Sequence, residues 1–307
     1  MKVYPTPADG LADGLRLAGA MTRKNAMAEL PLGGGKAVLA VPAVPEGAER
    51  RQILLRYADI VASMGGTYRT ACDMNTTEAD MDLIGERCPF VFGRSVDRGG
   101  SGTSAPATAV GVFHGIRASV AQAFGSRSLE GRRILVQGVG AVGKPLARLL
   151  SEAGAAVTVS DVATGRARGA AQELGARQVA AEDAMGTECD VLAPCATGGV
   201  LNPETIAGLR CRVVAGAANN QLGAASDAEL LHAAGILYAP DYVINAGGII
   251  HLVGLESLGW TQPQLDERLE RIGDTLGVIF RAAEDAGIST GLAAERMVEA
   301  RLAAAAK

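Results

Sequence analysis

The fold is decided by residues 136–143, which read Val-Gln-Gly-Val-Gly-Ala-Val-Gly. This is a G-x-G-x-x-G turn with an apolar strand, Ile134 to Val136, in front of it and a helix-forming segment, Pro145 to Glu152, behind it. A second apolar strand over 156–160 follows and runs into Asp161. The order strand, glycine turn, helix, strand and acid is the fingerprint of a dinucleotide-binding unit.

Each part of this unit has its own task. Gly138 allows the tight turn, Gly140 lets the backbone approach a pyrophosphate, and Gly143 lets the helix pack close to the strand. The helix N-terminus attracts the phosphate charge. Asp161 follows at near the usual spacing of a carboxylate that accepts from the ribose 2′-hydroxyl. Because a carboxylate there would repel a 2′-phosphate, the sequence favours NAD over NADP.

Composition excludes several classes of protein. The chain has 307 residues, enough for two domains, and its net charge of −4 comes from charges mixed along the sequence, with no basic tract for nucleic acid or a membrane surface. No apolar run reaches transmembrane length, and the N-terminus has no signal-peptide core. Five scattered cysteines and three separate histidines argue against a disulfide framework and against a metal site. We therefore expect a cytoplasmic protein with no nucleic-acid partner, no membrane partner and no metal.

The first part of the chain reads as a mixture of helices and short strands. Helices are expected over 8–30, 46–64 and 107–124. Short strands are expected over 37–41 and 68–71, and the strand over 37–41 is expected to be buried. The second helix is expected to place its apolar residues on one side: Ile53, Leu54, Tyr57, Ile60 and Val61.

From residue 131 onward strands and helices alternate regularly. Strands are readable at 133–137, 156–160, 189–194, 212–216 and 236–238. Such alternation predicts a parallel sheet covered by helices on both faces. The fold class is therefore α/β with two domains: an N-terminal α/β substrate domain over 1–124 and a doubly wound Rossmann sheet over 125–280. A helical segment over 281–307 is expected to pack back on the first domain.

Two residues of the first domain could carry chemistry. Lys36 follows Gly33-Gly34-Gly35, where the backbone can crowd close and the ammonium can be partly desolvated. Desolvation and a second nearby cation both favour a neutral amine that can act as a base. Asp73 lies where the strand expected from residue 68 comes to its end. Taken alone, the glycine turn reads more simply as a flexible surface turn, and Asp73 as a turn-forming or helix-capping residue.

Polar residues also follow strands of the second domain. Asn219 and Asn220 come after the strand at 212–216, and Asn245 comes after the strand at 236–238. Because the carboxyl ends of strands in open α/β sheets face the ligand crevice, these amides could contact a carboxylate or a ribose. Cys195 reads as a packing residue, since no histidine or other base is close in sequence to activate it.

Taken together, the chain resembles the amino-acid dehydrogenase family of glutamate, leucine, valine and phenylalanine dehydrogenases. The likeness covers nearly the whole chain and is closest to the leucine/valine/phenylalanine branch. The segments that carry it are Met21 to Lys24, Leu32 to Lys36, Ala71 to Thr76, Gly93 to Ser95, Gly138 to Gly143, Ala193 to Ala196, Gly216 to Asn220, and Tyr238 to Gly248.

The resemblance implies a role for each matching residue. Lys24 would bind the substrate α-carboxylate, Lys36 would be the catalytic lysine, and Asp73 would carry protons for the amine. Asn219 would contact substrate and cofactor, with Asn245 nearby as a second substrate-binding residue. The implied cofactor-binding set is Ser104, Thr108, Gly138, Val139, Gly140, Ala141, Val142, Gly143, Lys144, Ser160, Asp161, Arg166, Ala196, Thr197, Ala217 and Asn219.

The resemblance also implies a reaction: NAD-dependent oxidative deamination of an L-amino acid to the 2-oxo acid and ammonia, and its reverse, in a homo-oligomer. Pro31, the stretch 90–94 and the run 236–260 favour phenylalanine, with leucine and valine as alternatives. Family members begin several dozen residues earlier, with a segment that ends in a Gly-Gly-x-Arg-like sequence. Without that segment one pocket wall is in question, and weak or no activity is expected.

Two other interpretations stay open. One is an inactive nucleotide-binding or regulatory homologue that has lost part of its pocket. The other is a different NAD enzyme, such as a hydroxyacid dehydrogenase. The second is disfavoured because the sequence offers no plausible catalytic histidine, His251 being more typical of a packed residue.

Overall fold

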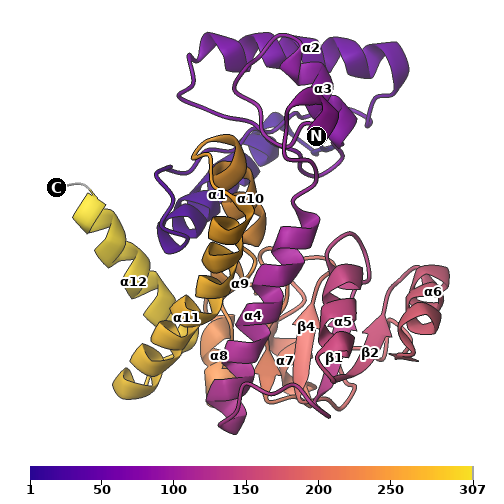
Figure 1. Ribbon diagram of the computed structural model, residues 1–307, viewed down its shortest axis with the longest axis vertical. Coiled ribbons are helices and arrows are strands. Elements are labelled where there is room, and N and C mark those ends of the chain that lie inside the picture. Colours follow the sequence, from indigo (N-terminus) through magenta and orange to yellow (C-terminus); the bar gives the residue numbers. More distant parts are fainter. Residues whose placement is uncertain (306–307) are drawn as a thin grey trace. The chain divides into compact units, whose positions relative to one another are not determined.

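The computed structural model describes residues 1–305, which form two compact units (Figure 1). The N-terminal unit comprises Met1–Ser104 together with Ile249–Leu265. The sheet unit comprises Ala105–Gly248 and the chain from Asp266 onward. These ranges differ from the boundary expected near residue 124, because the helix that precedes it groups with the sheet and the later segment 249–265 groups with the N-terminal residues.

The N-terminal unit is built mainly from helices: α1 (Pro7–Met27), α2 (Gly47–Ser63), α3 (Glu78–Gly85), the short 3-10 helix η1 (Val96–Arg98) and most of α10 (Gly247–Glu256). Both α1 and α3 begin with a capping box, in which a threonine and an aspartate three residues later satisfy each other's backbone N–H groups. Buried apolar residues of α2 and α3, among them Leu54 and Ile84, form the core of this unit.

Two strands expected in this unit are not present in the part of the chain that the structure describes. The segment 37–41 makes one isolated bridge, from Ala40 to Lys2, and is only partly buried. The segment 68–71 makes one bridge, from Thr70 to Val91. A single bridge does not extend into a ladder, so the local β-propensity has no partner strand to satisfy it. The expected apolar face of α2 is also wrong at Ile60, which is 62% exposed.

The sheet unit contains the predicted parallel sheet. Its strands are β1 (Arg133–Gln137), β2 (Ala156–Ser160), β3 (Arg177–Gln178), β4 (Val191–Pro194), β5 (Val213–Val214) and β6 (Leu237–Tyr238). Their order is β3-β2-β1-β4-β5-β6, with every neighbouring pair parallel. This is the doubly wound order, in which ligands bind where the chain reverses direction across the sheet, between β1 and β4. The two-residue strand β3 was not expected, because its polar sequence carries no strand signal.

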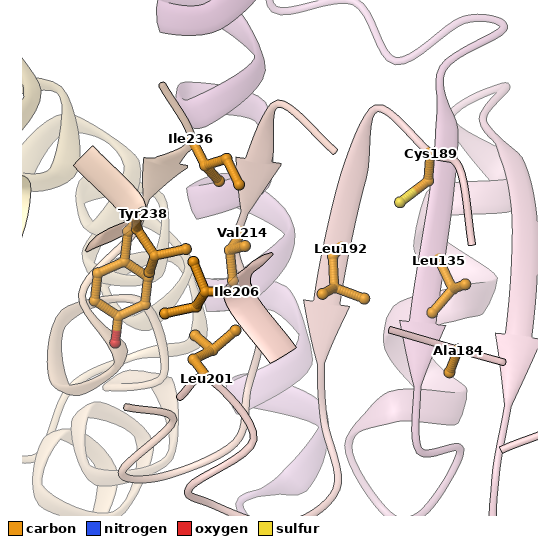
Figure 2. Close-up of a cluster of buried hydrophobic side chains, with 10 residues drawn as sticks. Leu135, Ala184, Cys189, Leu192, Leu201, Ile206, Val214, Ile236 and Tyr238 are labelled. Atoms are coloured by element: carbon orange, nitrogen blue, oxygen red, sulfur yellow. The ribbon is translucent and has the colours of Figure 1, made fainter. Parts of the chain in front are cut away.

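The helices of the sheet unit are α4 (Ala105–Phe124), α5 (Gly143–Glu152), α6 (Thr164–Leu174), α7 (Pro203–Ala207), α8 (Asp227–Ala233), α9 (Asp241–Ile244), most of α11 (Gln262–Ala286) and α12 (Thr290–Ala305). Helices α4 and α5 pack on each other, α5 packs on β1 and β2, and α4 packs on β5 (Figure 1). A buried cluster that includes Leu135, Leu192 and Val214 fills one side of the central strands (Figure 2). Because these strands are buried on both faces, their sequences are continuous apolar runs.

The C-terminal helix α12 packs against α8 and β6 of the sheet unit. At its start, the hydroxyl of Thr290 donates to the Tyr238 carbonyl at 2.6 Å, and the hydroxyl of Ser289 donates to Glu229 at 2.5 Å. The structure therefore groups this helix with the sheet, where the sequence placed it on the first domain. No helix among residues 1–305 combines the length and the apolar character that crossing a membrane requires.

Candidate active site

The three glycines before Lys36 are exposed, but two of them lie against neighbouring groups. A Cβ at Gly34 would lie 2.1 Å from the Thr22 hydroxyl of α1, and one at Gly35 would lie 2.8 Å from the Tyr68 ring. The Asn25 amide, which is buried in α1, donates to the Gly33 carbonyl at 2.5 Å. The backbone passes too close to its neighbours for a side chain at Gly34 and Gly35, whereas a Cβ at Gly33 would meet nothing within 4 Å. These contacts hold the backbone that leads into Lys36.

Lys36 and Asp73, which lie 37 residues apart in sequence, form an ion pair in the structure. The Lys36 side chain is 24% exposed, so it is partly desolvated, while the Asp73 side chain is half-exposed. Asp73 lies in a tight turn, where its own carboxylate accepts from the Met74 N–H at 2.6 Å and its N–H donates to the Thr76 hydroxyl at 2.8 Å. The two residues that the sequence selected for chemistry are therefore adjacent.

Electrostatics favour the carboxylate form of Asp73. Burial raises the pKa of Asp73, but the Lys36 ammonium, the Met74 N–H and the charge of Lys24 together bring it below its ordinary value. Lys24, on α1, therefore lies close enough to act on Asp73. A cavity of about 270 Å³ adjoins the pair, with Lys36 and Asp73 as polar walls and Leu32, Tyr68, Phe92 and Ile249 among its less polar ones.

A second feature of the N-terminal unit is the loop over 93–102, which a partly buried hydrogen-bond network holds. The carboxylate of Glu256 accepts from the backbone N–H groups of Gly93 and Ser101 at 2.9 and 3.0 Å and from the Ser101 hydroxyl. His251 Nε2 lies 3.2 Å from the Ser101 carbonyl. His251 thus has a packing role in this loop, as the sequence indicated.

In the sheet unit, the three glycines of the turn occupy three different environments. Gly138 has φ +94°, a conformation that side chains rarely adopt. A Cβ at Gly140 would meet nothing within 4 Å, so the backbone is open to a ligand there. A Cβ at Gly143 would lie 1.8 Å from the Gly138 carbonyl oxygen, so only glycine lets α5 start so close to β1.

Asp161 lies at the carboxyl end of β2, beside this turn. Its side chain is buried, accepts from the Val139 N–H at 3.0 Å and from the Ala163 N–H at 2.8 Å, and lies 3.5 Å from the exposed Arg166 guanidinium. Ser160 is buried, and its hydroxyl donates to the Ala180 carbonyl at 3.3 Å, so its side chain is used in packing. The acid is thereby fixed against the glycine turn, where the fingerprint requires it.

Other residues of the expected cofactor set have mixed surroundings. Ala141 is exposed and Val142 half-buried in the turn before α5. Lys144 points its ammonium to Glu173 on α6 at 2.6 Å, which is an exposed pair away from the helix N-terminus. Ala196 and Thr197 are exposed after β4, and a Cβ at Gly138 would meet the Cβ and the backbone nitrogen of Ala196.

The two candidate asparagines are joined to each other. Asn245 is buried and donates its amide to the Asn219 side-chain oxygen at 2.8 Å and to the Ala217 carbonyl at 3.1 Å. Asn219 is exposed after β5. Because Asn245 is buried and Asn219 is exposed, Asn245 orients Asn219 through this hydrogen bond, and Asn219 is the asparagine of the two that a ligand can reach.

The remaining expected residues lie where α4 begins. Ser104 precedes α4 and Thr108 lies in its first turn, both half-buried. Burial raises the pKa of the Cys195 thiol to about 12, which supports packing and not nucleophilic attack as its role. Among the described residues, no group of three or more histidine, cysteine or acidic side chains could hold a metal ion.

Comparison with known proteins now adds the family. Residues 99–166 and 163–306 match the family described as Glutamate/Leucine/Phenylalanine/Valine dehydrogenase, and residues 5–89 match the Glu/Leu/Phe/Val dehydrogenase dimerisation domain. The chain belongs to this amino-acid dehydrogenase family. The resemblance stated from the motifs is confirmed, and the protein is an oxidoreductase whose Rossmann-type unit implies a nucleotide cofactor.

Among the similar proteins are leucine, valine and tryptophan dehydrogenases. Leucine dehydrogenase of Geobacillus stearothermophilus is 42% identical over 302 residues, which cover 98% of this chain and 82% of that protein. Valine dehydrogenase of Streptomyces coelicolor is 42% identical over 305 residues, covering 98% and 83%. The crystal structure of L-tryptophan dehydrogenase from Nostoc punctiforme is 37% identical, with a TM-score of 0.82, and the match covers 97% of this chain and 85% of that one.

Within this amino-acid dehydrogenase, sequence reasoning missed two groups that hold the lysine and the aspartate. Asn25 follows Thr22, Arg23 and Lys24, so the local sequence carries no signal that its side chain is buried. The second group is Arg50 of α2 with Asp80 of α3, a pair that contacts the turn after Asp73. The Thr77-x-x-Asp80 pattern does predict a helix cap. Its arginine partner lies 30 residues away and carries no local signal.

Proposed function

We propose that the chain is an NAD-dependent dehydrogenase that oxidatively deaminates L-amino acids with apolar side chains. The observation that carries the proposal is the Lys36–Asp73 pair beside a cavity with both polar and apolar walls. The leucine, valine and tryptophan dehydrogenases among the similar proteins, which are 37–42% identical to this chain, support an apolar side chain on the substrate. Phenylalanine, which the sequence favours, remains the specific prediction.

Each residue then has a chemical task. The bound nicotinamide would accept the hydride that leaves the substrate α-carbon. Lys24 would hold the substrate carboxylate by charge, and Asp73 would accept the proton that the amine loses. Lys36 would hold the water whose oxygen bonds to the iminium carbon, while one proton of that water passes to the nitrogen. The remaining hydroxyl proton would leave to solvent, and Lys36 would stabilise the resulting alkoxide. Collapse of the alkoxide to the carbonyl would break the C–N bond, release ammonia and leave the 2-oxo acid.

The preference for NAD over NADP rests on Asp161. Its carboxylate is fixed against the glycine turn, so a 2′-phosphate on the ribose would meet negative charge. Arg166, although near, is already beside that carboxylate. We expect NAD to bind at least about 10-fold more tightly than NADP, because one unfavourable charge contact at this site is worth more than about 1.4 kcal/mol.

The homo-oligomer is also part of the proposal. The N-terminal match is to a dimerisation domain, and a solved relative, the glutamate dehydrogenase from Thermus thermophilus, is described as hetero-hexameric. Two leucines of α1, Leu11 and Leu15, are each 67% exposed and lie one turn apart. Such an apolar stripe is typical of a surface that a subunit covers, and light scattering of the purified chain tests it.

Substrate oxidation tests the proposed activity directly. Reduction of NAD is followed with phenylalanine, leucine, valine, tryptophan and glutamate as substrates, and we expect the apolar amino acids to lead. In Lys36→Ala, kcat should fall about 100- to 10,000-fold, because a group that takes part in acid–base chemistry is lost, while NAD affinity stays nearly unchanged.

The control for this variant is Lys2→Ala, since Lys2 is an exposed lysine of the same unit that pairs with Asp13. A wild-type rate in Lys36→Ala would remove Lys36 from its role. Glutamate as the best substrate would contradict the apolar pocket. Tight NAD binding without turnover of any amino acid would instead favour the inactive nucleotide-binding homologue.

A further inference from the structure

The turn that carries Asp73 is too short to hold its own place. It closes on itself through the Thr76 N–H, which donates to the Asp73 carbonyl at 2.9 Å, and through Asn75 at φ +58°. Both features act within the turn. Met1 ties the turn to the N-terminus, since its amino group donates to the Met74 carbonyl at 3.1 Å and its carbonyl accepts from the Asn75 amide at 3.1 Å. A link to the helices of the unit needs a further group.

The Arg50 guanidinium links the turn to α2 and α3. Its Nη2 donates to the Asn75 carbonyl at 2.8 Å, within the turn. The same guanidinium grips Asp80 with two donors, from Nε to Oδ1 at 2.8 Å and from Nη2 to Oδ2 at 2.6 Å. A bidentate arginine–carboxylate pair is directional as well as strong, so it fixes the orientation of the guanidinium that reaches the turn.

Asp80 connects Arg50 to the start of α3. Its Oδ2 accepts from the Thr77 N–H at 2.7 Å and from the Thr77 hydroxyl at 2.9 Å, so the acid that holds Arg50 also caps α3 directly after the turn. The Arg50 side chain is 20% exposed and that of Asp80 9% exposed. Burial raises the pKa of Asp80, but Arg50 and Thr77 bring it below its ordinary value, so the pair is ionised at neutral pH.

We propose that Arg50 is a positioning residue of the dehydrogenase: through Asn75 and Asp80 it holds the 73–77 turn so that Asp73 stays beside Lys36. Arg50 itself touches neither Lys36 nor Asp73 in the contacts that define the site. The inference rests on the proposed roles of Lys36 and Asp73. It adds a specific prediction, that removing a guanidinium outside the site changes the chemical step.

The test compares Arg50→Met with Arg51→Met. Arg51 is the next residue of α2 and carries the same charge. It pairs at 3.1 Å with Glu86, which directly follows α3, but both members of this pair are exposed. We expect Arg50→Met to lower kcat at least about 10-fold well below its melting temperature, with KM for NAD within about twofold of wild type. Arg51→Met should match wild type in both.

The pH profile separates positioning from a general structural role. The charged groups that act on Asp73 are Lys36 and Lys24, and the Met1 amino group is nearby. If the turn drifts from Lys36, the pKa of Asp73 rises, so the acid limb of kcat/KM moves to higher pH in Arg50→Met. A variant that melts earlier but keeps the wild-type kcat and acid limb at low temperature would show that Arg50 is a structural brace only, and would overturn the proposal.

A second variant guards against misfolding. Arg50→Lys keeps the charge but loses the planar fork, so it cannot contact Asp80 with two donors and reach Asn75 together. We expect an intermediate kcat and an intermediate acid limb. If Arg50→Met does not fold, these two values for Arg50→Lys decide, and wild-type values would overturn the proposal.

Failure of the proposed function is distinguishable from failure of this inference. If the wild-type chain oxidises no amino acid, the proposed function falls. Hydrogen exchange at the Thr76 amide then still reports the turn: we expect exchange at least about 10-fold faster in Arg50→Met than in Arg51→Met. Equal exchange rates of the Thr76 amide in the two variants would contradict the proposal that Arg50 holds the turn, whether or not the chain is catalytically active.

Discussion

At the scale of single residues, charge and close approach explain the site. Lys36 pairs with Asp73, and the lysine is held in place because the glycines before it pack against α1 and Tyr68. The sequence could select both residues through the family resemblance of the segments that contain them, since taken alone they read as a surface turn and a capping acid. It could not show that they touch.

The pKa of Asp73 is the measurement that belongs to this scale. In Lys36→Met the nearest cation is gone while burial remains, so the pKa of Asp73 should rise above its wild-type value, as ¹³C NMR of the carboxyl group can show. Because the wild-type pKa lies below the ordinary value, near 3.9, the stability from this pair is present above about pH 4 and is lost as the pH falls further. The stability difference between wild type and Lys36→Met should therefore shrink in acid.

A pKa for Asp73 in Lys36→Met that equals the wild-type value would contradict the assignment of Lys36 as its main partner. Asp59→Asn is a suitable background control, because Asp59 is an exposed acid paired with Arg87 at 2.9 Å. Its substitution should leave the resonance of Asp73 in place.

At the scale of elements, the β1–turn–α5 unit shows how one motif combines ligand binding with packing. Both tasks fall on glycines with different surroundings: Gly140 faces open space, and Gly143 faces the Gly138 carbonyl. This unit was predicted correctly because its signals are local, an apolar run followed by a fixed glycine spacing. Strands 37–41 and 68–71 failed because a strand also needs a partner, which the local sequence does not contain.

The two glycines give a matched pair of substitutions. Gly143→Ala should destabilise the sheet unit by about 3 kcal/mol, because its Cβ would lie 1.8 Å from a backbone oxygen that cannot move freely. Gly140→Ala should leave the free energy of unfolding within about 0.5 kcal/mol but weaken NAD binding at least about 10-fold, since its Cβ would occupy the space meant for the pyrophosphate. Urea unfolding and NAD titration measure the two effects.

The opposite result is equally clear. If Gly140→Ala binds NAD as well as wild type, the open space at that position is not where the pyrophosphate lies. If Gly143→Ala is as stable as wild type, α5 can shift away from β1, and the close approach is not required.

At the scale of the whole molecule, each structural unit is made of two stretches that are separate in the sequence. The segment 249–265 is encoded after the sheet but belongs to the N-terminal unit, while α12 belongs to the sheet unit. The single tryptophan, Trp260, lies in that returning segment and packs on Gly254. Its fluorescence therefore reports the N-terminal unit, although its position in the sequence suggests otherwise.

Cofactor binding should stabilise the sheet unit measurably. With NAD at 100 times its dissociation constant, linkage adds about 2.7 kcal/mol, so the slowest amides of β1 and β4 should exchange about 100-fold more slowly. Hydrogen exchange with mass spectrometry, with and without NAD, tests this at the level of each strand. Unchanged protection of β1 under saturating NAD would contradict binding at the end of that strand.

The sequence by itself determined the family, the dinucleotide-binding unit and the candidate residues, because those depend on short spacings and on apolar runs that the chain carries locally. Tertiary structure alone decided which distant groups hold the site: Arg50 on Asp80, 30 residues apart, and Asn245 on Asn219, 26 residues apart. It also decided that 249–265 joins the N-terminal unit. The physical reason is that hydrogen bonds and packing act over a few ångströms in space, whatever the separation along the chain.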